Sequence, residues 1–233
     1  MRPVAAFGQR QFHIVFLFLG LTLWCSLLFA ADASKPFGSY DEVAKSDVPS
    51  RVLQRGIARD GKSKRYSDLL SLDGGTVGIA HFAVGGLAEL YRHMDTARYF
   101  NKSQEEMVGH YSSACRPAGK TGNDTGWGCF TMDWWRDGMK AFLASEESSK
   151  VQNAAWASMM RPVIELALNH SWRDPRSIAI ALGISNSLGK GGFFTLAQHR
   201  HWDAEAVLAA YVSTNEHRRR RKQAIDEHFP KAD

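Results

Sequence analysis

Residues 71–82 read SLDGGTVGIAHF, and the chain continues through residues 85–93 as GGLAELYRH. Adjacent glycines favour loop backbone, so the sequence predicts a tight turn that begins at Asp73. After this turn, Val77, Ile79 and Phe82 either alternate as in a strand or lead into a helix. Apolar residues at helical spacing then predict that helix. The stretch therefore predicts a carboxylate on a glycine turn, followed by an amphipathic helix.

Most of the remaining sequence predicts helices, with little sheet. Short helices are expected after Pro49, over residues 62–72 and over residues 103–112. In the second half of the chain, apolar residues recur at helical spacing, which places Trp135 and Trp156 on buried faces. The fold class that we expect is mainly α.

The long helices of the second half have clear start and stop signals. Pro162 should kink or divide a helix over residues 149–169, because proline removes a backbone donor. Asp174 before a proline begins the next helix, and the glycines of residues 189–192 break it. Asp203 caps the helix expected to be the last one. We find no repeat and no internal linker, which favours one domain.

The N-terminus reads as a targeting segment. Arginines precede an almost unbroken apolar stretch over residues 13–30, and small residues follow it. This pattern predicts a secretory signal peptide over residues 1–33, cleaved after Ala33, which leaves residues 34–233 as the domain. An uncleaved membrane anchor is the alternative, and the chain would then be a membrane-anchored interaction protein. Either way, the N-terminal segment touches a membrane at least transiently, and we expect a periplasmic or secreted protein.

Two cysteines, Cys115 and Cys129, lie beyond this segment and flank a polar, glycine-rich loop. In an oxidising compartment such a pair predicts a disulfide, with two free thiols as the alternative. Neither cysteine has the spacing of a metal site, so we expect no metal. The glycines near Lys190 lack the Ser or Thr of a phosphate loop, so we expect no nucleotide and no other cofactor.

The formal net charge is +5, and five consecutive basic residues stand at positions 218–222. This run predicts a solvated helix face, with a polyanion contact as the alternative. No nucleic-acid motif accompanies the run, so we expect no nucleic-acid partner. Trp127 lies in a glycine-rich loop and is a candidate for stacking on a sugar ring, because the faces of pyranose rings are apolar.

The Asp73 turn and the helix after it resemble the family 46 chitosanases of the lysozyme-like superfamily. The shared features are an Asp-Gly turn, a Gly-Ile run with an aromatic residue, further glycines, and a helix that carries Leu-Glu-Leu and a histidine. Residues 130–192 follow the order of the same family more loosely, through a Trp-rich helix and an Ala-Leu-Gly-Ile-Ser-Asn helix that ends in glycines.

The resemblance implies a two-lobed, lysozyme-like fold with a polysaccharide cleft between the lobes. It implies a glycoside hydrolase that cuts β-1,4-linked aminosugar polymers, peptidoglycan or chitosan, with inversion. In such enzymes the two catalytic carboxyl groups stand about 6.5–9.5 Å apart. Asp73 would be the base that activates water, Thr76 would hold that water, and Asp95 would bind substrate.

One departure from the family concerns the general acid. The resemblance places Gln54 or Arg55 where the family has its acid glutamate, and neither can donate a proton as a carboxylic acid does. Asp60 or Glu42 could replace it if the backbone were shifted. The sequence thus leaves two functions open, a hydrolase and a catalytically impaired glycan-binding protein on the same scaffold. The positive charge suits a neutral or anionic polymer better than cationic chitosan.

Overall fold

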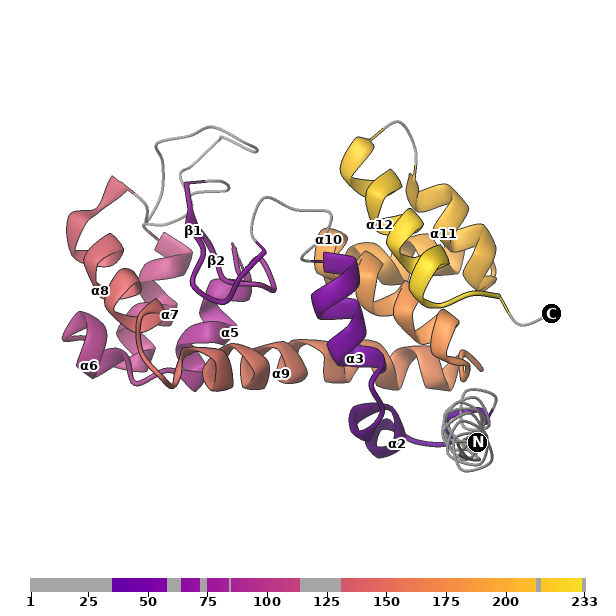
Figure 1. Cartoon of the computed structure of the whole chain (residues 1–233), viewed down its shortest axis with the longest axis horizontal. Helices are drawn as coiled ribbons and strands as arrows, with labels where there is room; N and C mark the ends of the chain where they lie inside the picture. Colours follow the sequence, from indigo (N-terminus) through magenta and orange to yellow (C-terminus); the bar gives the residue numbers. More distant parts are fainter. Residues whose placement is uncertain are drawn as a thin grey trace, which may run out of the picture. The chain divides into compact units, whose positions relative to one another are not determined.

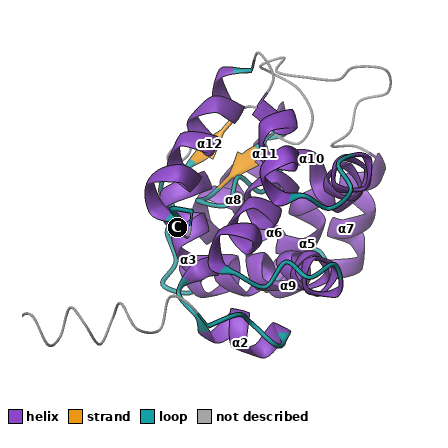
Figure 2. Cartoon of the chain, turned by 90° about the vertical axis from the view of Figure 1, so that its right-hand side faces the viewer, coloured by secondary structure: helices purple, strands orange, loops and turns teal. Residues whose placement is uncertain are grey.

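The structure is a computed structural model that describes residues 35–57, 64–71, 75–83, 85–113, 131–212 and 215–231. The chain divides into two compact units, residues 1–36 and residues 37–233, and the elements below belong to the second unit. That unit is mainly helical, as the sequence predicted. Figure 2 shows two short strands among the helices of the described part.

The second unit contains short elements before residue 114 and long helices after residue 131. In chain order the elements are α2 (Tyr40–Lys45), α3 (Val48–Arg51), the π-helix η1 (Val52–Ile57), β1 (Leu69–Leu70), β2 (Thr76–Val77), α5 (Gly85–His93), α6 (Thr96–Phe100), α7 (Gln104–Ser113), α8 (Asp133–Leu143), α9 (Ser148–Asn169), α10 (Pro175–His199), α11 (Ala204–Val212) and α12 (Glu216–His228).

Helix α9 runs along both sets of elements described next. Figure 1 shows the hairpin and α5 to α8 along its first half, and α3 and α10 to α12 along its second half. Both α5 and α10 pack directly against α9. The apolar faces predicted for α8 and α9 are confirmed, because Trp135 and Trp156 are both buried. We call the two sets of elements the hairpin group and the α10 group.

The long helices follow most of their predicted signals. Helix α9 passes through Pro162 without ending, since the buried side chains of Met160 and Val163 hold it on both sides of the proline. The predicted break in α10 falls at Gly189, whose φ of 72° and ψ of 167° are not helical, and the helix then resumes. Asp203 caps α11 as predicted, with Oδ1 accepting the N–H of Ala206 at 3.0 Å. It does not cap the last helix, because α12 follows.

The helix predicted over residues 62–72 is wrong for the described part of that range. Residues 64–68 form a turn and Leu69–Leu70 is strand β1. The cause is Asp68, whose carboxylate accepts the backbone N–H groups of Lys64 and Arg65. A side chain that binds its neighbours' N–H groups competes with the hydrogen bonds of a helix.

The basic run lies on α12, but its side chains are more engaged than a solvated face would be. Arg221 is buried, and its Nη1 donates to the carbonyl of Gly183 at 2.6 Å. Its neighbour Lys222 pairs with Asp226. The run therefore helps to attach α12 to α10.

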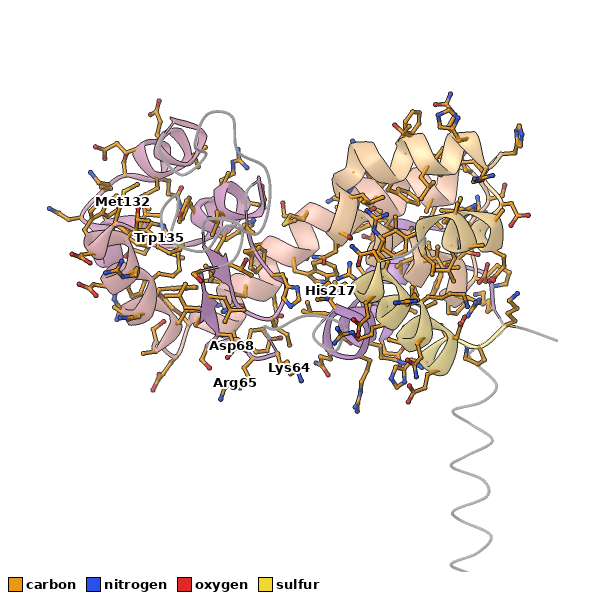
Figure 3. All side chains as sticks on the ribbon, turned by 90° about the horizontal axis from the view of Figure 1, so that it is seen from above. Lys64, Arg65, Asp68, Met132, Trp135 and His217 are labelled. Atoms are coloured by element: carbon orange, nitrogen blue, oxygen red, sulfur yellow. The ribbon has the colours of Figure 1, made fainter. Side chains whose placement is uncertain are left out.

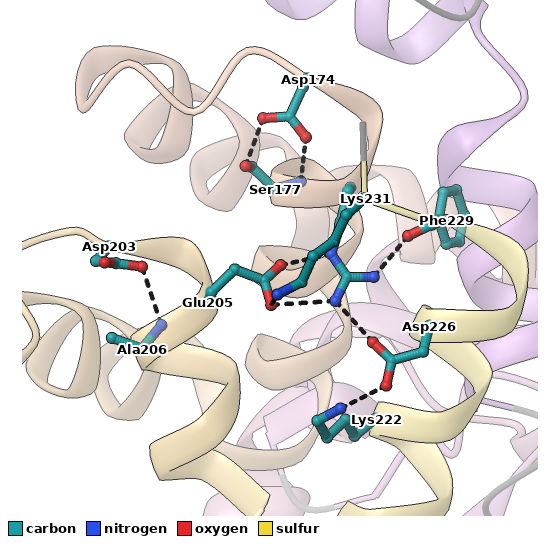
Figure 4. Close-up of polar contacts among 10 residues, drawn as sticks. Asp174, Ser177, Asp203, Glu205, Ala206, Lys222, Asp226, Phe229 and Lys231 are labelled. Atoms are coloured by element: carbon teal, nitrogen blue, oxygen red, sulfur yellow. Dashed lines mark hydrogen bonds and ion pairs between the residues drawn. The ribbon is translucent and has the colours of Figure 1, made fainter. Parts of the chain in front are cut away.

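A buried arginine joins the last three helices and the C-terminal segment (Figure 4). Arg176 on α10 bonds both carboxylate oxygens of Glu205 on α11 and donates to Asp226 on α12 at 2.7 Å. Its Nη1 also donates to the carbonyl of Phe229 at 2.6 Å. The Arg176 hydrogen bond lowers the pKa of Glu205. Burial would raise the pKa of Asp226, but hydrogen bonds from Lys222 and Arg176 outweigh burial and lower this pKa.

Candidate functional site at the hairpin

The predicted glycine turn connects two paired strands. Strands β1 and β2 are antiparallel, with Leu69 opposite Val77 and Leu70 opposite Thr76. Residues 71–75 join them, so Asp73 is three residues along the chain from each member of the Leu70–Thr76 pair. Asp73 itself lies outside the described residues. Thr76 is buried, 4% exposed, on β2.

The end of the turn rests on a buried tryptophan. Gly75 has a φ of +132°, and a Cβ added there would lie 2.7 Å from Cη2 of Trp135. The indole is itself fixed, because Trp135 Nε1 donates to the buried hydroxyl of Tyr91 at 2.7 Å. Figure 3 labels Trp135 and, from the segment before β1, Lys64, Arg65 and Asp68. Backbone conformation and space thus both require glycine at position 75.

A second glycine sits against a buried glutamine of α9. Gly78 has a φ of +65°, and a Cβ there would lie 1.8 Å from Oε1 of Gln152. That oxygen accepts the N–H of Ile79 at 3.2 Å, while Nε2 of Gln152 donates to the carbonyl of Tyr66 at 2.8 Å. One buried amide therefore connects α9 to the chain on both sides of the hairpin.

The α10 group also supports this region. Nδ2 of Asn186, on α10, donates to the carbonyl of Ala80 at 2.9 Å. On the α9 side, the hydroxyl of Tyr66 donates to Oδ1 of Asn153 at 2.8 Å. The hairpin is thus held by α8, α9 and α10, and hydrogen bonds that link distant segments hold a site more firmly than a loop alone does.

Asp68 is the described carboxylate nearest to the turn in sequence. It accepts the N–H of Lys64 at 2.7 Å, the N–H of Arg65 at 3.0 Å and Nε of Arg65 at 2.9 Å. Burial would raise the pKa of Asp68, but these hydrogen bonds outweigh burial and lower it. Asp68 is therefore ionised at neutral pH and suits an anchor or a base, not an acid.

Glu89, the glutamate of the Leu-Glu-Leu helix, is ionised for the same reason. Its carboxylate bonds Arg92 at 2.8 Å and His93 at 3.2 Å. Burial would raise the pKa of Glu89, but hydrogen bonds from Ser158, Arg92 and His93 lower it. Neither Asp68 nor Glu89 therefore has the protonated state that a general acid needs at neutral pH.

Gln54 belongs to the α10 group, on the π-helix η1. Its neighbours Leu53 and Gly56 are buried, whereas Gln54 and Arg55 are exposed. A π-helix holds more residues per turn than an α-helix, so it changes the direction of the side chains that follow, and such turns are frequent at functional sites. The structure thus has a π-helix in place of α-helix at the position that the resemblance gives to the acid.

The other predicted residues take different places. Asp95 is the N-cap of α6, where Oδ1 accepts the N–H of Arg98 at 3.2 Å. Glu42 on α2 uses its carboxylate to accept the N–H of Gly38 at 2.6 Å. Further predicted positions lie outside the described residues, namely Asp60, Trp127, Cys115, Cys129 and the segment before residue 35.

Sequence reasoning missed the residues that support the hairpin. Asp68 had a weak local signal, since aspartate side chains often accept nearby backbone N–H groups in turns. Gln152 and Asn186 had none, because each acts on a segment far away in the chain. The pairing of Gly75 with Trp135 was equally hidden.

The described part of the chain contains no cluster of three or more histidine, cysteine or acidic side chains that could hold a metal ion. None of its helices has both the length and the hydropathy needed to cross a bilayer. The chain matches no protein-family model, and comparison with curated proteins and with solved structures gives no significant match. The function must therefore be argued from the residues themselves.

Proposed function

We propose that the chain is an exported glycoside hydrolase that cuts β-1,4 links in an aminosugar polymer, peptidoglycan or chitosan. The proposal includes a lysozyme-like arrangement in which the hairpin group and the α10 group are two lobes on either side of a polysaccharide cleft. The observation that carries it is the support of the hairpin. Gly75 and Gly78, which have positive φ, lie against buried side chains, and helices from three parts of the chain fix the hairpin. A catalytic carboxylate needs such support, because small errors in its position are costly.

In this proposal Asp73 is the general base. Its carboxylate takes a proton from a water molecule, and that water attacks the anomeric carbon on the face opposite the leaving group, which inverts the configuration. The glycosidic oxygen receives its proton from a second carboxyl group. Asp68 would add negative charge near the base, which keeps Asp73 ready to accept a proton.

The second carboxyl group in this proposal is Asp60. It stands three residues after the end of η1 and is the first carboxyl group of the chain after position 54. Asp68 and Glu89 are poor alternatives, because hydrogen bonds lower both pKa values.

The assignment of Asp73 as the general base is tested by measuring the reducing ends released from peptidoglycan and from chitosan. Asp73→Asn should lower the rate by about 10²–10⁴-fold, the usual contribution of a general base. The matched control is Asp137→Asn, which changes an exposed carboxylate on α8 and should leave the rate unchanged. If Asp73→Asn retains the rate of the wild type, this assignment is wrong.

A pair of substitutions tests the acid. Asp60→Asn should lower the rate by about 10²–10⁴-fold, whereas Gln54→Glu should change it little. If Asp60→Asn left the rate unchanged and Gln54→Glu raised it, the acid site would be at position 54. In that case Gln54→Glu would restore a missing proton donor and raise a weak activity.

A non-catalytic glycan-binding protein is the second candidate function. Glutamine at position 54, where the resemblance expects an acid, favours it. Sedimentation with insoluble peptidoglycan or chitosan separates the two candidates. The binding protein would sediment with the polymer as wild type and as Asp73→Asn, and neither form would release reducing ends.

A further inference from the structure

The break in α10 turns the helix back on itself. A straight helix of 25 residues would hold its ends about 36 Å apart. Here the two ends meet, because Nε1 of Trp172, just before α10, donates to the carbonyl of Trp202, just after it, at 2.6 Å. The direction changes at Gly189, whose φ of 72° and ψ of 167° are open almost only to glycine. The residues around Gly189 therefore form a tip that lies away from both ends of α10.

The tip of α10 lies against the hairpin group. Asn186, three residues before Gly189, donates through Nδ2 to the carbonyl of Ala80 at 2.9 Å. Ala80 belongs to the turn after β2, which is closed by the N–H of residue 82 donating to the carbonyl of residue 77 at 2.9 Å. Lys190 follows Gly189 directly, so its Cα is within about 14 Å of that of Asn186. Lys190 is therefore placed where the α10 group meets the hairpin group.

Lys190 is accessible to a large ligand. Its side chain is exposed, and a Cβ added at Gly189 or Gly191 would meet no atom within 4 Å. Within the part of the chain that the structure describes, Lys190 has no ion-pair partner. An exposed ammonium group with open space on both sides can receive an anionic group of a polymer.

A second cation without an ion-pair partner among the described residues stands on the hairpin group. The N–H of Lys64 donates to the carboxylate of Asp68 at 2.7 Å, which fixes the backbone of Lys64 beside β1. The side chain of Lys64 is exposed. In Figure 3, Lys64 lies at the edge of the hairpin group that is nearest to the α10 group. Lys64 and Lys190 would thus stand on the two sides of the proposed cleft.

Cations exceed carboxylates on the described segments that would line this cleft, namely η1, residues 64–71, residues 75–83 and α10. Asp68 is the one carboxylate among these residues, and Arg65 pairs with it at 2.9 Å. Arg55 on η1 is exposed and, within the described chain, has no ion-pair partner either. The catalytic carboxyl groups of the proposed mechanism, Asp60 and Asp73, would repel an anionic polymer, so such a polymer needs cations beside them.

From these observations we infer that Lys64 and Lys190 bind carboxylate groups of the polymer, and that the polymer is therefore peptidoglycan and not chitosan. The lactyl and peptide substituents of peptidoglycan carry carboxylates, whereas chitosan carries cationic amino groups that the two lysines would repel. The inference rests on the proposed function for the cleft in which the polymer lies. An exposed ion pair raises affinity by at most about fivefold, so the two lysines select the polymer and take no part in the chemical step.

Sedimentation of the full chain with insoluble peptidoglycan tests the inference. One sample keeps its carboxyl groups, and in a second sample carbodiimide coupling with methylamine converts them into neutral amides. The wild type should bind the native sample about tenfold more tightly at low ionic strength, where charges are least screened. Lys64→Gln with Lys190→Gln should lower affinity for the native sample by about tenfold and leave affinity for the amidated sample unchanged.

Lys45→Gln with Lys140→Gln is the charge-matched control, because these lysines are exposed on α2 and α8. The control should bind both samples as the wild type does. An unchanged circular dichroism spectrum shows that each double variant is folded. Equal binding of the wild type to both samples, tighter binding to chitosan, or an equal loss of affinity in the control would overturn the inference.

The binding measurement is independent of cleavage. A wild-type chain that prefers the native sample through Lys64 and Lys190 but releases no reducing ends would refute the proposed hydrolase and support this inference. A chain that cuts both samples and binds them equally would support the hydrolase and overturn this inference.

Discussion

Substituting Gly78 by alanine measures how firmly α9 holds the hairpin. Two costs follow from the structure. A φ of +65° places the residue in the left-handed region, which costs an alanine about 1–2 kcal/mol. The new Cβ would also lie 1.8 Å from Oε1 of Gln152, so the amide must move and abandon the buried N–H of Ile79. An unsatisfied buried donor costs about 1–3 kcal/mol.

The free energy of unfolding should therefore fall by about 2–5 kcal/mol, a large part of the 5–15 kcal/mol typical of a domain. Thermal unfolding should show a Tm lower by roughly 5–15 °C for a chain of this size. Gly191→Ala is the matched control. A Cβ at Gly191 meets no atom within 4 Å, and alanine there should raise stability by up to about 1 kcal/mol because it favours helix.

A double-mutant cycle with Gln152→Ala separates the two costs. Without the amide there is nothing for the new Cβ to displace, so Gly78→Ala should cost only about 1–2 kcal/mol in that background. Equal costs in both backgrounds, measured by urea unfolding, would refute the account of how α9 supports the hairpin.

Three further substitutions test other contacts. Arg176→Met should lower the free energy of unfolding at pH 7 by about 1–3 kcal/mol, at the low end for a buried ion pair because the carboxylates of Glu205 and Asp226 can regain water. The fold lowers the pKa values of Glu205 and Asp226 below their ordinary values of 4.5 and 3.8. The stability that the ion pairs add to the wild type should therefore be lost as the pH falls below those values. An equally steep loss of stability in acid for Arg176→Met would contradict this assignment. Trp135→Phe removes a buried hydrogen bond and should lower the free energy of unfolding by about 1–3 kcal/mol. It should also reduce the rate of hydrolysis. Full activity in that variant would contradict the role given to the hairpin. Ser103→Ala removes the hydroxyl that accepts the N–H of Glu106 at the start of α7. Urea unfolding should show a free energy of unfolding lower by about 1 kcal/mol. No change would show that this cap does not stabilise the helix.

Local signals explain what the sequence could predict. The buried faces of α8 and α9 follow from helical spacing, and the starts of α10 and α11 follow from Asp174 and Asp203 as caps. These features depend on residues within one or two turns of each other. The same kind of signal predicted the turn after Asp73, because two glycines stand together there.

The support of the candidate site depends on contacts that no local pattern contains. Gln152 is 73 residues from the backbone N–H that it accepts, and Asn186 is 106 residues from its carbonyl partner. The strand at Leu69–Leu70 was missed because its leucines also fit a helix, while the side chain of Asp68 closed a turn instead. The run of five predicts a solvated face, since nothing in it marks Arg221 as the residue that bonds the carbonyl of Gly183.

The most direct test of the account is the configuration of the first product. Proton NMR can follow the anomeric signals while wild-type protein cuts a β-1,4-linked oligomer of chitosan or peptidoglycan glycan. The account predicts the α anomer first, because Asp73 activates water on the face opposite the leaving group. A β anomer first, or no cleavage of either oligomer by a folded protein, would contradict it.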